Sequence, residues 1–177
     1  MHEMARESGL FLRALVPSDS AQALAAHAEL AHEDFEFLLG WTGQNWKDYL
    51  AELDRERRGV DLPGGWVPAT FLVGDVAGHI VGRVSIRHRL SARLAEVGGH
   101  IGYVTRPAFR GRGYATEMLR QSLAVAREVG VEQALLTCDD TNLTSAATIE
   151  KCGGRLEAVV AARDGVPAKR LYWIEIL

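Results

Sequence analysis

The chain has 177 residues, 47% of them hydrophobic and 24% charged, with a formal net charge of −3 at pH 7. This length and composition predict a single globular domain over residues 1–177 and exclude a disordered chain. The small negative charge argues against bulk attraction to nucleic acid or to an anionic membrane.

The amino-terminal part alternates short elements with breaks. Residues 10–15 predict a strand, and residues 17–30 predict a helix that begins at a Pro-Ser pair. Residues 32–43 fit neither the helix period nor the strand period. Residues 45–58 predict an amphipathic helix that ends at the Pro- and Gly-containing segment 61–68. The apolar face of that helix consists of Trp46, Tyr49, Leu50 and Leu53.

From residue 69 onward the pattern becomes that of strands. Residues 69–75 and 79–88 are rich in strand-forming residues and flank a short Val-Ala-Gly turn, which predicts a hairpin. Residues 97–105 and 132–138 predict two further strands, with a helix over 113–129 between them. A strand–helix–strand crossover predicts that these two strands are parallel.

The carboxy-terminal part predicts one more helix and a final hairpin. The helix spans residues 142–152 and ends at two glycines. The strands 155–162 and 168–176 flank the turn Arg-Asp-Gly-Val-Pro.

The segment RPAFRGRGYATEML, residues 106–119, joins a predicted strand to a predicted helix. The amino end of a helix has unpaired N–H groups, and Gly111 and Gly113 let a ligand approach the backbone. Arg110 and Arg112 add forked donors. The joint predicts a site for a phosphorylated ligand, with a solvated basic turn as the alternative. It lacks the Gly-Lys-Ser/Thr of a P-loop and the third glycine of a dinucleotide fingerprint.

This segment resembles the acetyl-CoA motif Q/R-x-x-G-x-G/A of the GNAT (GCN5-related) N-acetyltransferases, with Arg110, Gly113 and Ala115 at its three defining positions. A second block, residues 137–154, resembles the later strand and helix of the same family. Its matching residues are Asn142, Ser145, Glu150, Lys151 and Gly153. The resemblance is clearest over residues 69–175, whereas residues 31–68 match only in the order of their elements.

The resemblance implies an α+β fold, in which a mixed, mostly antiparallel sheet of about seven strands is splayed between two parallel strands and flanked by helices. It implies acetyl-CoA as the acyl donor, with its pantetheine arm in the splay beside the backbone near Val104 and Arg106. It places the pyrophosphate on the amides of residues 111–116 and the pantetheine on Asn142, whose alternative role is a helix N-cap alone. The residues expected to bind the donor are Val104, Thr105, Arg106, Arg110, Gly111, Arg112, Gly113, Tyr114, Ala115, Thr116, Asn142, Ser145 and Lys151.

Transfer to an amine needs a base, a donor to the oxyanion and a proton for the leaving thiolate. The resemblance implies the strand amide near Val104 as the oxyanion donor. Ile149 stands where the family often has a proton-donating tyrosine, so Tyr172 is the candidate replacement, with packing as its alternative role. His100 is the candidate base, about 13 Å along the strand from Val104, with a packed structural histidine as the alternative.

The resemblance therefore implies an acetyl-CoA-dependent N-acetyltransferase that transfers the acetyl group directly to an amine of unknown identity. The alternative is a coenzyme A-binding module without activity, which the missing tyrosine supports. A nucleotide-binding oxidoreductase is disfavoured by the details of the glycine-arginine loop.

Localisation and partners are expected from what the sequence does not contain. No apolar run reaches the roughly 18 residues of a membrane helix, and residues 1–9 are polar, with no secretory pattern behind them. Cys138 and Cys152 form neither a disulfide framework nor a metal-type spacing. We therefore expect a cytoplasmic protein without metal, nucleic acid or membrane as partner. The family often forms homodimers, but no stretch of this sequence requires one.

Overall fold

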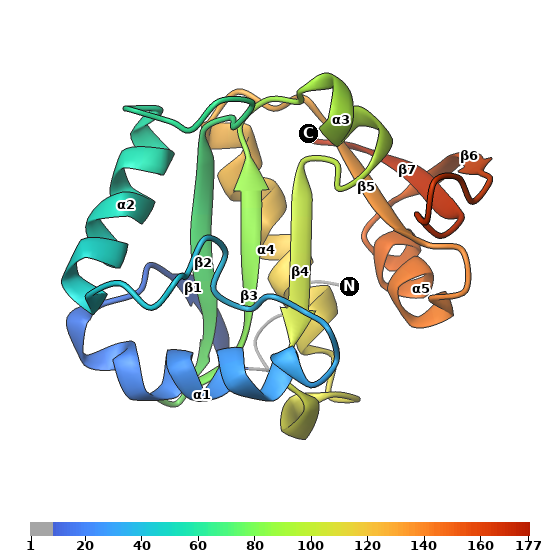
Figure 1. Ribbon diagram of the computed structural model, residues 1–177. Helices are drawn as coiled ribbons and strands as arrows, with labels where there is room; N and C mark the ends of the chain where they lie inside the picture. The colour runs from blue at the N-terminus through green and yellow to red at the C-terminus, as the bar shows by residue number, and fades with distance from the viewer. Residues whose placement is uncertain (1–8) are drawn as a thin grey trace.

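The computed structural model describes residues 9–177, which form two sheets with helices around them (Figure 1). The strands are β1 (Leu10–Arg13), β2 (Ala69–Val76), β3 (His79–Arg87), β4 (Ile101–Thr105), β5 (Gln133–Asp139), β6 (Arg155–Val160) and β7 (Lys169–Glu175). The helices are α1 (Ser20–Ala31), α2 (Trp46–Arg58), α3 (Ala92–Glu96), α4 (Tyr114–Glu128) and α5 (Leu143–Lys151). The first sheet has the order β1-β2-β3-β4, the second has the order β5-β7-β6, and the ladders within them are antiparallel.

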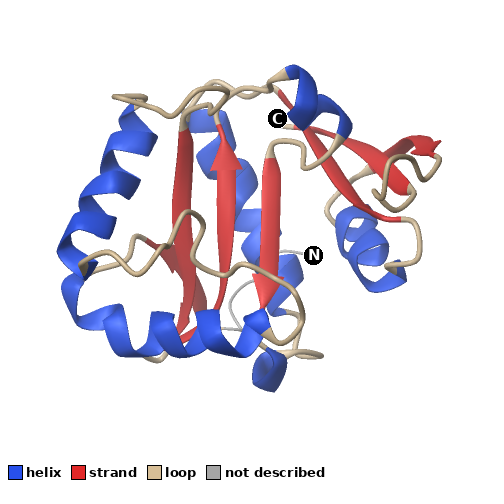
Figure 2. Ribbon diagram, in the orientation of Figure 1, coloured by secondary structure: helices blue, strands red, loops and turns tan. Residues whose placement is uncertain are grey.

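The helices divide the hydrophobic core into two layers. Helices α1 and α2 lie on one face of the first sheet and α4 lies on the other (Figures 1 and 2). One layer packs α4 against the first sheet and also includes Ile149 and Tyr172. The other packs α1 and α2 against Phe71 and Val73 of β2. The predicted apolar face of α2 is confirmed, because Tyr49 is buried and its three partners pack against this second layer.

Residues 32–45 form no helix or strand, in line with their ambiguous pattern. The side chains of Phe37 and Leu38 are fully buried and anchor this segment to the core. The segment passes over β3 and β4 on the side of α1 and α2 (Figure 1). The short helix α3 was not predicted.

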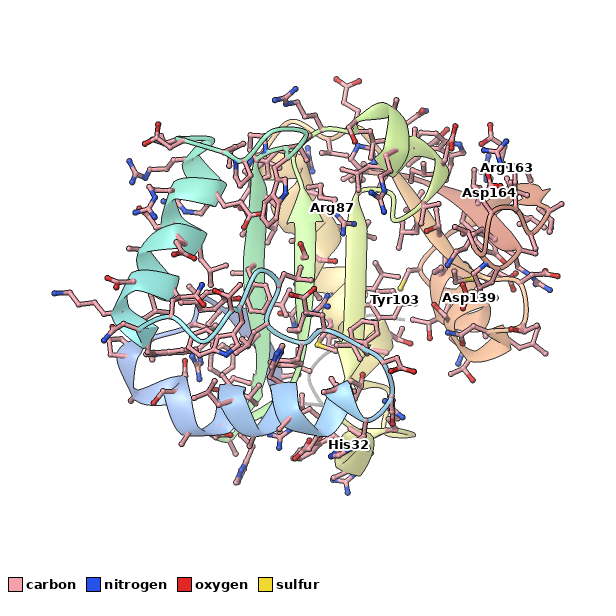
Figure 3. All side chains as sticks on the ribbon, in the orientation of Figure 1. His32, Arg87, Tyr103, Asp139, Arg163 and Asp164 are labelled. Atoms are coloured by element: carbon pink, nitrogen blue, oxygen red, sulfur yellow. The ribbon has the colours of Figure 1, made fainter. Side chains whose placement is uncertain are left out.

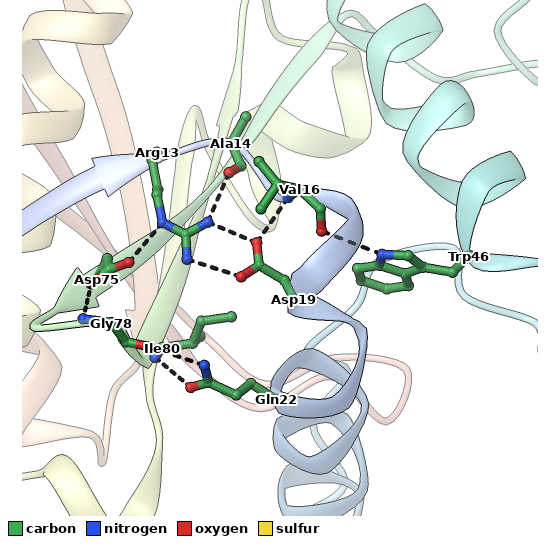
Figure 4. A network of polar contacts seen from close by, with 9 residues as sticks. All are labelled: Arg13, Ala14, Val16, Asp19, Gln22, Trp46, Asp75, Gly78 and Ile80. Atoms are coloured by element: carbon green, nitrogen blue, oxygen red, sulfur yellow. Dashed lines mark hydrogen bonds and ion pairs between the residues drawn. The ribbon is translucent and has the colours of Figure 1, made fainter.

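An ion-pair network fixes the start of α1 against the first sheet (Figure 4). Arg13 of β1 pairs with Asp19 at 2.7 Å and with Asp75 of β2 at 2.7 Å. The side chain of Gln22 accepts the N–H of Ile80 at 2.9 Å. These contacts set the direction of α1 and, through it, the path of residues 32–45 across the sheet.

The residues just before β4 meet the middle of β5, and the two strands then diverge (Figure 1). Their contact is an isolated bridge between Gly99 and Leu136, with the N–H of His100 donating to the carbonyl of Leu135 at 2.7 Å. Gly99 has a φ of +62°, and a Cβ there would lie 2.3 Å from the carbonyl oxygen of Leu135, so the close approach requires glycine.

A side chain ends the pairing at this point. The N–H of Leu135 donates to the ring Nδ1 of His100 at 2.9 Å instead of to a strand carbonyl. The two strands run in a common direction, as expected (Figure 1). The expected parallel ladder between residues 97–105 and 132–138 does not form, and the isolated bridge between the two segments, Gly99 with Leu136, is antiparallel. The result is the splayed arrangement that the resemblance implies.

Candidate functional site

A cavity of about 680 Å³ lies where β4, the start of α4 and α5 face one another; we call it the splay cavity. Most of the predicted donor-binding residues line it. They are Val104, Thr105, Arg110, Gly111, Gly113, Tyr114, Ala115, Thr116, Asn142, Ser145 and Lys151. Lining residues that the sequence did not predict are Glu33, Phe35, Tyr103, Phe109, Thr144 and Thr148. The fold thus brings the two sequence motifs to one cavity.

The amino end of α4 is open to this cavity. Gly113 is the N-cap residue, and no side chain caps the helix. Gly111 and Gly113 have φ values of +76° and +79°, and nothing lies within 4 Å of where their Cβ atoms would stand. The N–H groups of the first turn have no partner inside the helix, and the helix dipole places partial positive charge on them. This end of α4 is therefore suited to bind an anion.

The free edge of β4 supplies the second wall. The N–H of Arg106 donates to the carbonyl of Val81 at 2.8 Å, and the carbonyl of His100 accepts the N–H of Arg87 at 2.7 Å. Since only alternate residues of an antiparallel pair bond to the partner strand, the backbone of Val104 faces β3. The N–H and C=O groups that point into the splay are those of Tyr103 and Thr105, of which the carbonyl of Thr105 accepts Nε of Arg110 at 3.1 Å.

Thr105 contains a further unsatisfied group. Its hydroxyl oxygen is the one buried side-chain polar atom without a hydrogen-bond partner among residues 9–177. A buried polar group without a partner is costly and is normally paired in a native protein. A ligand with hydrogen-bonding amides along the edge of β4 would satisfy both this hydroxyl and the free strand groups.

The amino end of α5 closes the cavity on the opposite side. Asn142 is its N-cap, with the side-chain oxygen accepting the N–H of Ser145 at 3.1 Å. The hydroxyl of Tyr103 lies 2.8 Å from that of Ser145, and Figure 3 shows Tyr103 on the side of β4 that faces α5. Burial raises the pKa of Tyr103 to about 12, so the phenol keeps its proton at neutral pH.

The three arginines of the predicted loop lie in different places. Arg110 lines the cavity, where its guanidinium pairs with Glu33 at 2.7 Å. The side chain of Arg106 pairs with Glu29 at 2.6 Å and does not line the cavity. Arg112 also lies outside the lining. Its guanidinium carbon is 5.9 Å from the centre of the Phe109 ring.

The two predicted catalytic residues do not line the splay cavity. Tyr172 is fully buried, and its hydroxyl donates to Glu150 at 2.9 Å. The ring of His100 accepts the N–H of Leu135 through Nδ1, and burial and the nearby Arg87 lower its pKa. A neutral imidazole has one acceptor nitrogen, and here it is in use. His100 acting as a base stays a prediction that requires this bond to open.

A second cavity of about 660 Å³, the α2 cavity, lies on the other side of the first sheet. Its walls come from α2, α3, β3 and the loops around residues 36–40 and 64–67. Its charged lining residues are Glu36, Glu56, Arg87 and Arg93. The sequence did not predict this cavity. The pattern of residues 79–88 indicates one strand of a hairpin and does not show what covers that strand.

Residues 9–177 contain neither a candidate metal site nor a candidate membrane-spanning helix. No group of three or more His, Cys, Asp or Glu side chains is placed to hold a metal ion. No helix in the described part of the chain is long and apolar enough to span a membrane.

Comparison with family models gives a match to the acetyltransferase (GNAT) domain over residues 9–155. The chain belongs to the GNAT acetyltransferase family. The resemblance seen in residues 106–119 and 137–154 is thereby confirmed. No curated protein matches the sequence.

Solved structures of other GNAT acetyltransferases share the fold. One is an acetyl transferase from Salmonella typhimurium that modifies the N-terminal serine of the 50S ribosomal protein L7/L12. It is 15% identical, with a TM-score of 0.70 over 97% of each chain. A second is Mycobacterium smegmatis RimJ in complex with CoA-disulfide, 21% identical, with a TM-score of 0.69 over 94% of this chain and 81% of that one.

A third is the microcin C7 self-immunity acetyltransferase MccE in complex with acetyl-CoA and AMP, 18% identical, with a TM-score of 0.68 over 97% of this chain and 94% of that one. At these identities the likeness concerns the fold, and it confirms the expected α+β GNAT architecture.

Proposed function

We propose that the protein transfers the acetyl group of acetyl-CoA directly to an amine. The observation that carries this proposal is that one cavity joins the uncapped amino end of α4 to the unpaired edge of β4. The first element suits the phosphates of a nucleotide, and the second suits the amides of an extended arm. Coenzyme A contains both groups in one molecule, and the proposal draws support from the bound acetyl-CoA and CoA-disulfide in MccE and RimJ.

The residues present fit such a donor. The first-turn N–H groups of Tyr114, Ala115 and Thr116 would hold the pyrophosphate, with the guanidinium of Arg110 beside them. The strand groups of Tyr103 and Thr105 would hold the pantetheine amides, and the unpartnered hydroxyl of Thr105 would gain a bond there.

The reaction itself needs little from the protein beyond position and proton transfer. The uncharged amine attacks the thioester carbonyl, a C–N bond forms and the C–S bond breaks. The amine proton passes to water or to a base, and the leaving thiolate takes up a proton. Among the strand groups, the N–H donors free to approach the oxyanion belong to Tyr103 and Thr105, next to the expected Val104.

The cysteines support direct transfer over an acyl-cysteine intermediate. Burial raises the pKa of Cys138, and it raises the pKa of Cys152 to about 11. Both side chains are therefore thiols at neutral pH, and a thiol is a poor nucleophile in comparison with a thiolate.

The test is a screen of amines with acetyl-CoA that detects free coenzyme A thiol, together with thermal-shift measurements with coenzyme A and with NAD. We expect stabilisation by coenzyme A but not by NAD, and release of thiol with at least one amine. Stabilisation by coenzyme A without thiol release from any amine would favour the inactive binding module instead.

A further inference from the structure

Three polar residues form a row on the α2-facing side of β3. Side chains alternate along a strand, so Arg83, Ser85 and Arg87 share one face. This face is covered by α1, α2 and residues 32–45 (Figure 1). Arg83 is 4% exposed and Ser85 is 3% exposed, so the row lies inside the protein. Polar residues on a central strand need partners, and the partners of the two arginines in this row are backbone carbonyls.

Within residues 9–177, the guanidinium groups of Arg83 and Arg87 have no carboxylate partner at ion-pair distance. Arg83 donates through Nε to the carbonyl of Phe37 at 3.0 Å and through Nη2 to that of Glu36 at 2.7 Å. Its Nη1 has no partner among the described residues. Arg87 donates through Nη1 to the carbonyls of Gly98 and Gly99, each at 3.1 Å. Carbonyl groups are neutral, so the buried Arg83 and the half-buried Arg87 are compensated only through the more distant carboxyls of Glu36 and Glu56.

Both arginines point to the same place on β4. An ideal Cβ on Gly102 would lie 3.9 Å from Nη1 of Arg83 and 3.9 Å from Nη1 of Arg87. Gly102 pairs with Ser85 in the ladder, so the hydroxyl of Ser85 lies in the same row. Because Gly102 has no side chain, space remains between the two cations. Burial and the nearby Arg87 together lower the pKa of Arg83 to about 10, so this guanidinium remains cationic at neutral pH.

Ser85 and Arg87 of this row line the α2 cavity, whereas Arg83 and Gly102 are not among its lining residues. Figure 3 shows Arg87 near the carboxyl end of β3, beside β4. The guanidinium carbon of Arg83 is 5.0 Å from the centre of the ring of Phe35, which lines the splay cavity. Val104 is two residues beyond Gly102 on the same face, about 7 Å along the strand.

The opposite wall of the α2 cavity carries acids. Glu36 and Glu56 line it, and the carboxyl of Glu56 has no hydrogen-bond partner among residues 9–177. Burial raises the pKa of Glu56 to about 7 despite the nearby Arg87, so at neutral pH this carboxyl only partly offsets the arginine charge. The cavity therefore offers both cations and acids, which is the complement of a molecule that carries both signs of charge.

We propose that the acceptor is an amine that also carries a carboxylate, and that Arg83 and Arg87 bind this carboxylate beside Gly102. The proposal rests on the proposed function, because it takes the amine of this molecule to be the group acetylated at the Val104 end. Guanidinium groups pair well with planar carboxylates. A phosphate in the same place would need more hydrogen-bond donors than a carboxylate. The helix beside the cavity, α3, has only five residues and is too short to supply them from its amino end.

The test measures binding separately from transfer. The protein saturated with coenzyme A is titrated calorimetrically with a panel of α-amino acids, their carboxamides and the matching aminophosphonates. We expect at least one amino acid to bind, with its carboxamide and its phosphonate at least about 10-fold weaker, as expected for the loss of one charge-assisted hydrogen bond. Equal binding of acid and amide, preference for the phosphonate, or no binding by any amino acid would overturn the proposal.

Two variants assign the effect to the arginine row. Arg87→Gln should remove the preference for the acid over the amide, and Gly102→Val should block the space between the guanidinium groups without removing a charge. Gly102 has an ordinary strand φ, and the nearest atoms to an added Cβ are 3.9 Å away, so this variant is expected to fold. Arg58→Gln, on the exposed side of α2, is the matched control and should retain the preference. A retained preference in Arg87→Gln would contradict the assignment.

The thiol assay then separates the two proposals. Thiol release with amines irrespective of a carboxylate leaves the acetyltransferase proposal standing and overturns this one. Carboxylate-dependent binding without thiol release overturns the acetyltransferase proposal and, with it, the role of the bound molecule as acceptor, and leaves only a carboxylate-binding site.

Discussion

The two cavities beside β4 are built from different parts of the chain. The splay cavity presents mainly backbone groups: the first turn of α4, the free edge of β4 and glycines with positive φ. The α2 cavity presents four charged side chains, Glu36, Glu56, Arg87 and Arg93, among mostly uncharged lining residues. A backbone-built site can hold a ligand shared by a whole family, since it depends on local geometry. A side-chain-built site can change its ligand with a few substitutions, which suits the acceptor end of the reaction.

The largest effect should follow from closing the backbone site. Gly113→Val places a branched side chain at a φ of +79°, where the backbone must shift and the approach to α4 is blocked. We expect coenzyme A binding to weaken about 100-fold or more, as for the loss of two charge-assisted hydrogen bonds, measured by titration calorimetry.

Gly130→Val is the matched control for backbone strain. Gly130 follows the other end of α4, has a φ of +90° and also has open space around it. It should lose thermal stability without losing affinity for coenzyme A. If Gly113→Val is folded and binds as tightly as the parent protein, the splay cavity is not the phosphate site.

His100 tests whether a residue at the joint between the sheets also takes part in chemistry. If it is the predicted base, His100→Ala lowers the turnover number about 100-fold, flattens the acidic limb of the pH–rate profile and leaves the affinity for coenzyme A unchanged.

His100→Gln separates that role from the structural one. Glutamine can still accept the N–H of Leu135 but cannot take up a proton. If His100 is the base, the turnover number of His100→Gln should be as low as that of His100→Ala. If His100→Gln turns over about as fast as the parent protein, His100 is not the base, and its role is the hydrogen bond to Leu135.

Asn142 tests how far side chains contribute to the backbone-built site. Asn142→Asp preserves the cap of α5 but removes the amide donor, so we expect coenzyme A to bind about 10-fold more weakly, the value of one lost hydrogen bond. Asn45→Asp, at the N-cap of α2, is the control, because Asn45 makes the same kind of cap outside the cavity. Unchanged affinity in Asn142→Asp would show that the residue is a cap alone.

The smallest effect concerns the charge of the α2 cavity. The pKa of Glu56 is about 7 in the folded protein, against about 4.3 in an unfolded chain. The folded state therefore binds more protons between these values, and its stability falls as the pH rises from about 4.3 to 7. Glu56→Gln should remove this part of the decline, so the variant should be more stable than the parent protein at pH 8 but not at pH 4.

Chemical denaturation at the two pH values checks this prediction. Glu128→Gln, on the exposed end of α4, should show no such difference. An identical decline in the parent protein and in Glu56→Gln would mean that the Glu56 carboxyl is not held in a partly neutral state.

The sequence predicted the splay cavity better than the α2 cavity, for a physical reason. Gly111, Gly113 and Asn142 act through the ends of helices, where the spacing of nearby residues decides the geometry. Arg83 and Arg87 alternate with apolar residues along β3, a pattern that usually places the polar side chains in solvent. Only the position of α2 and residues 32–45 above this face shows that they are buried, and that position depends on contacts distant in sequence.

The same limit applies at β4. Tyr103 and Val104 are neighbours in sequence, but the register with β3 decides which of them presents its backbone to the splay. The separation of β4 from β5 depends on Gly99 and His100 meeting Leu135, about one helix and one loop later in the chain. The sequence alone therefore could not predict which backbone groups of β4 face the splay. Nor could it predict where the contact between β4 and β5 ends.

A crystal structure of the protein with coenzyme A tests the central claim most directly, namely that the splay cavity holds the acyl donor. We predict pyrophosphate oxygens within hydrogen-bond distance of the N–H groups of Tyr114, Ala115 or Thr116, and pantetheine amides paired with the backbone of Tyr103 and Thr105. Coenzyme A bound elsewhere, or bound with its phosphates away from the start of α4, would contradict the account.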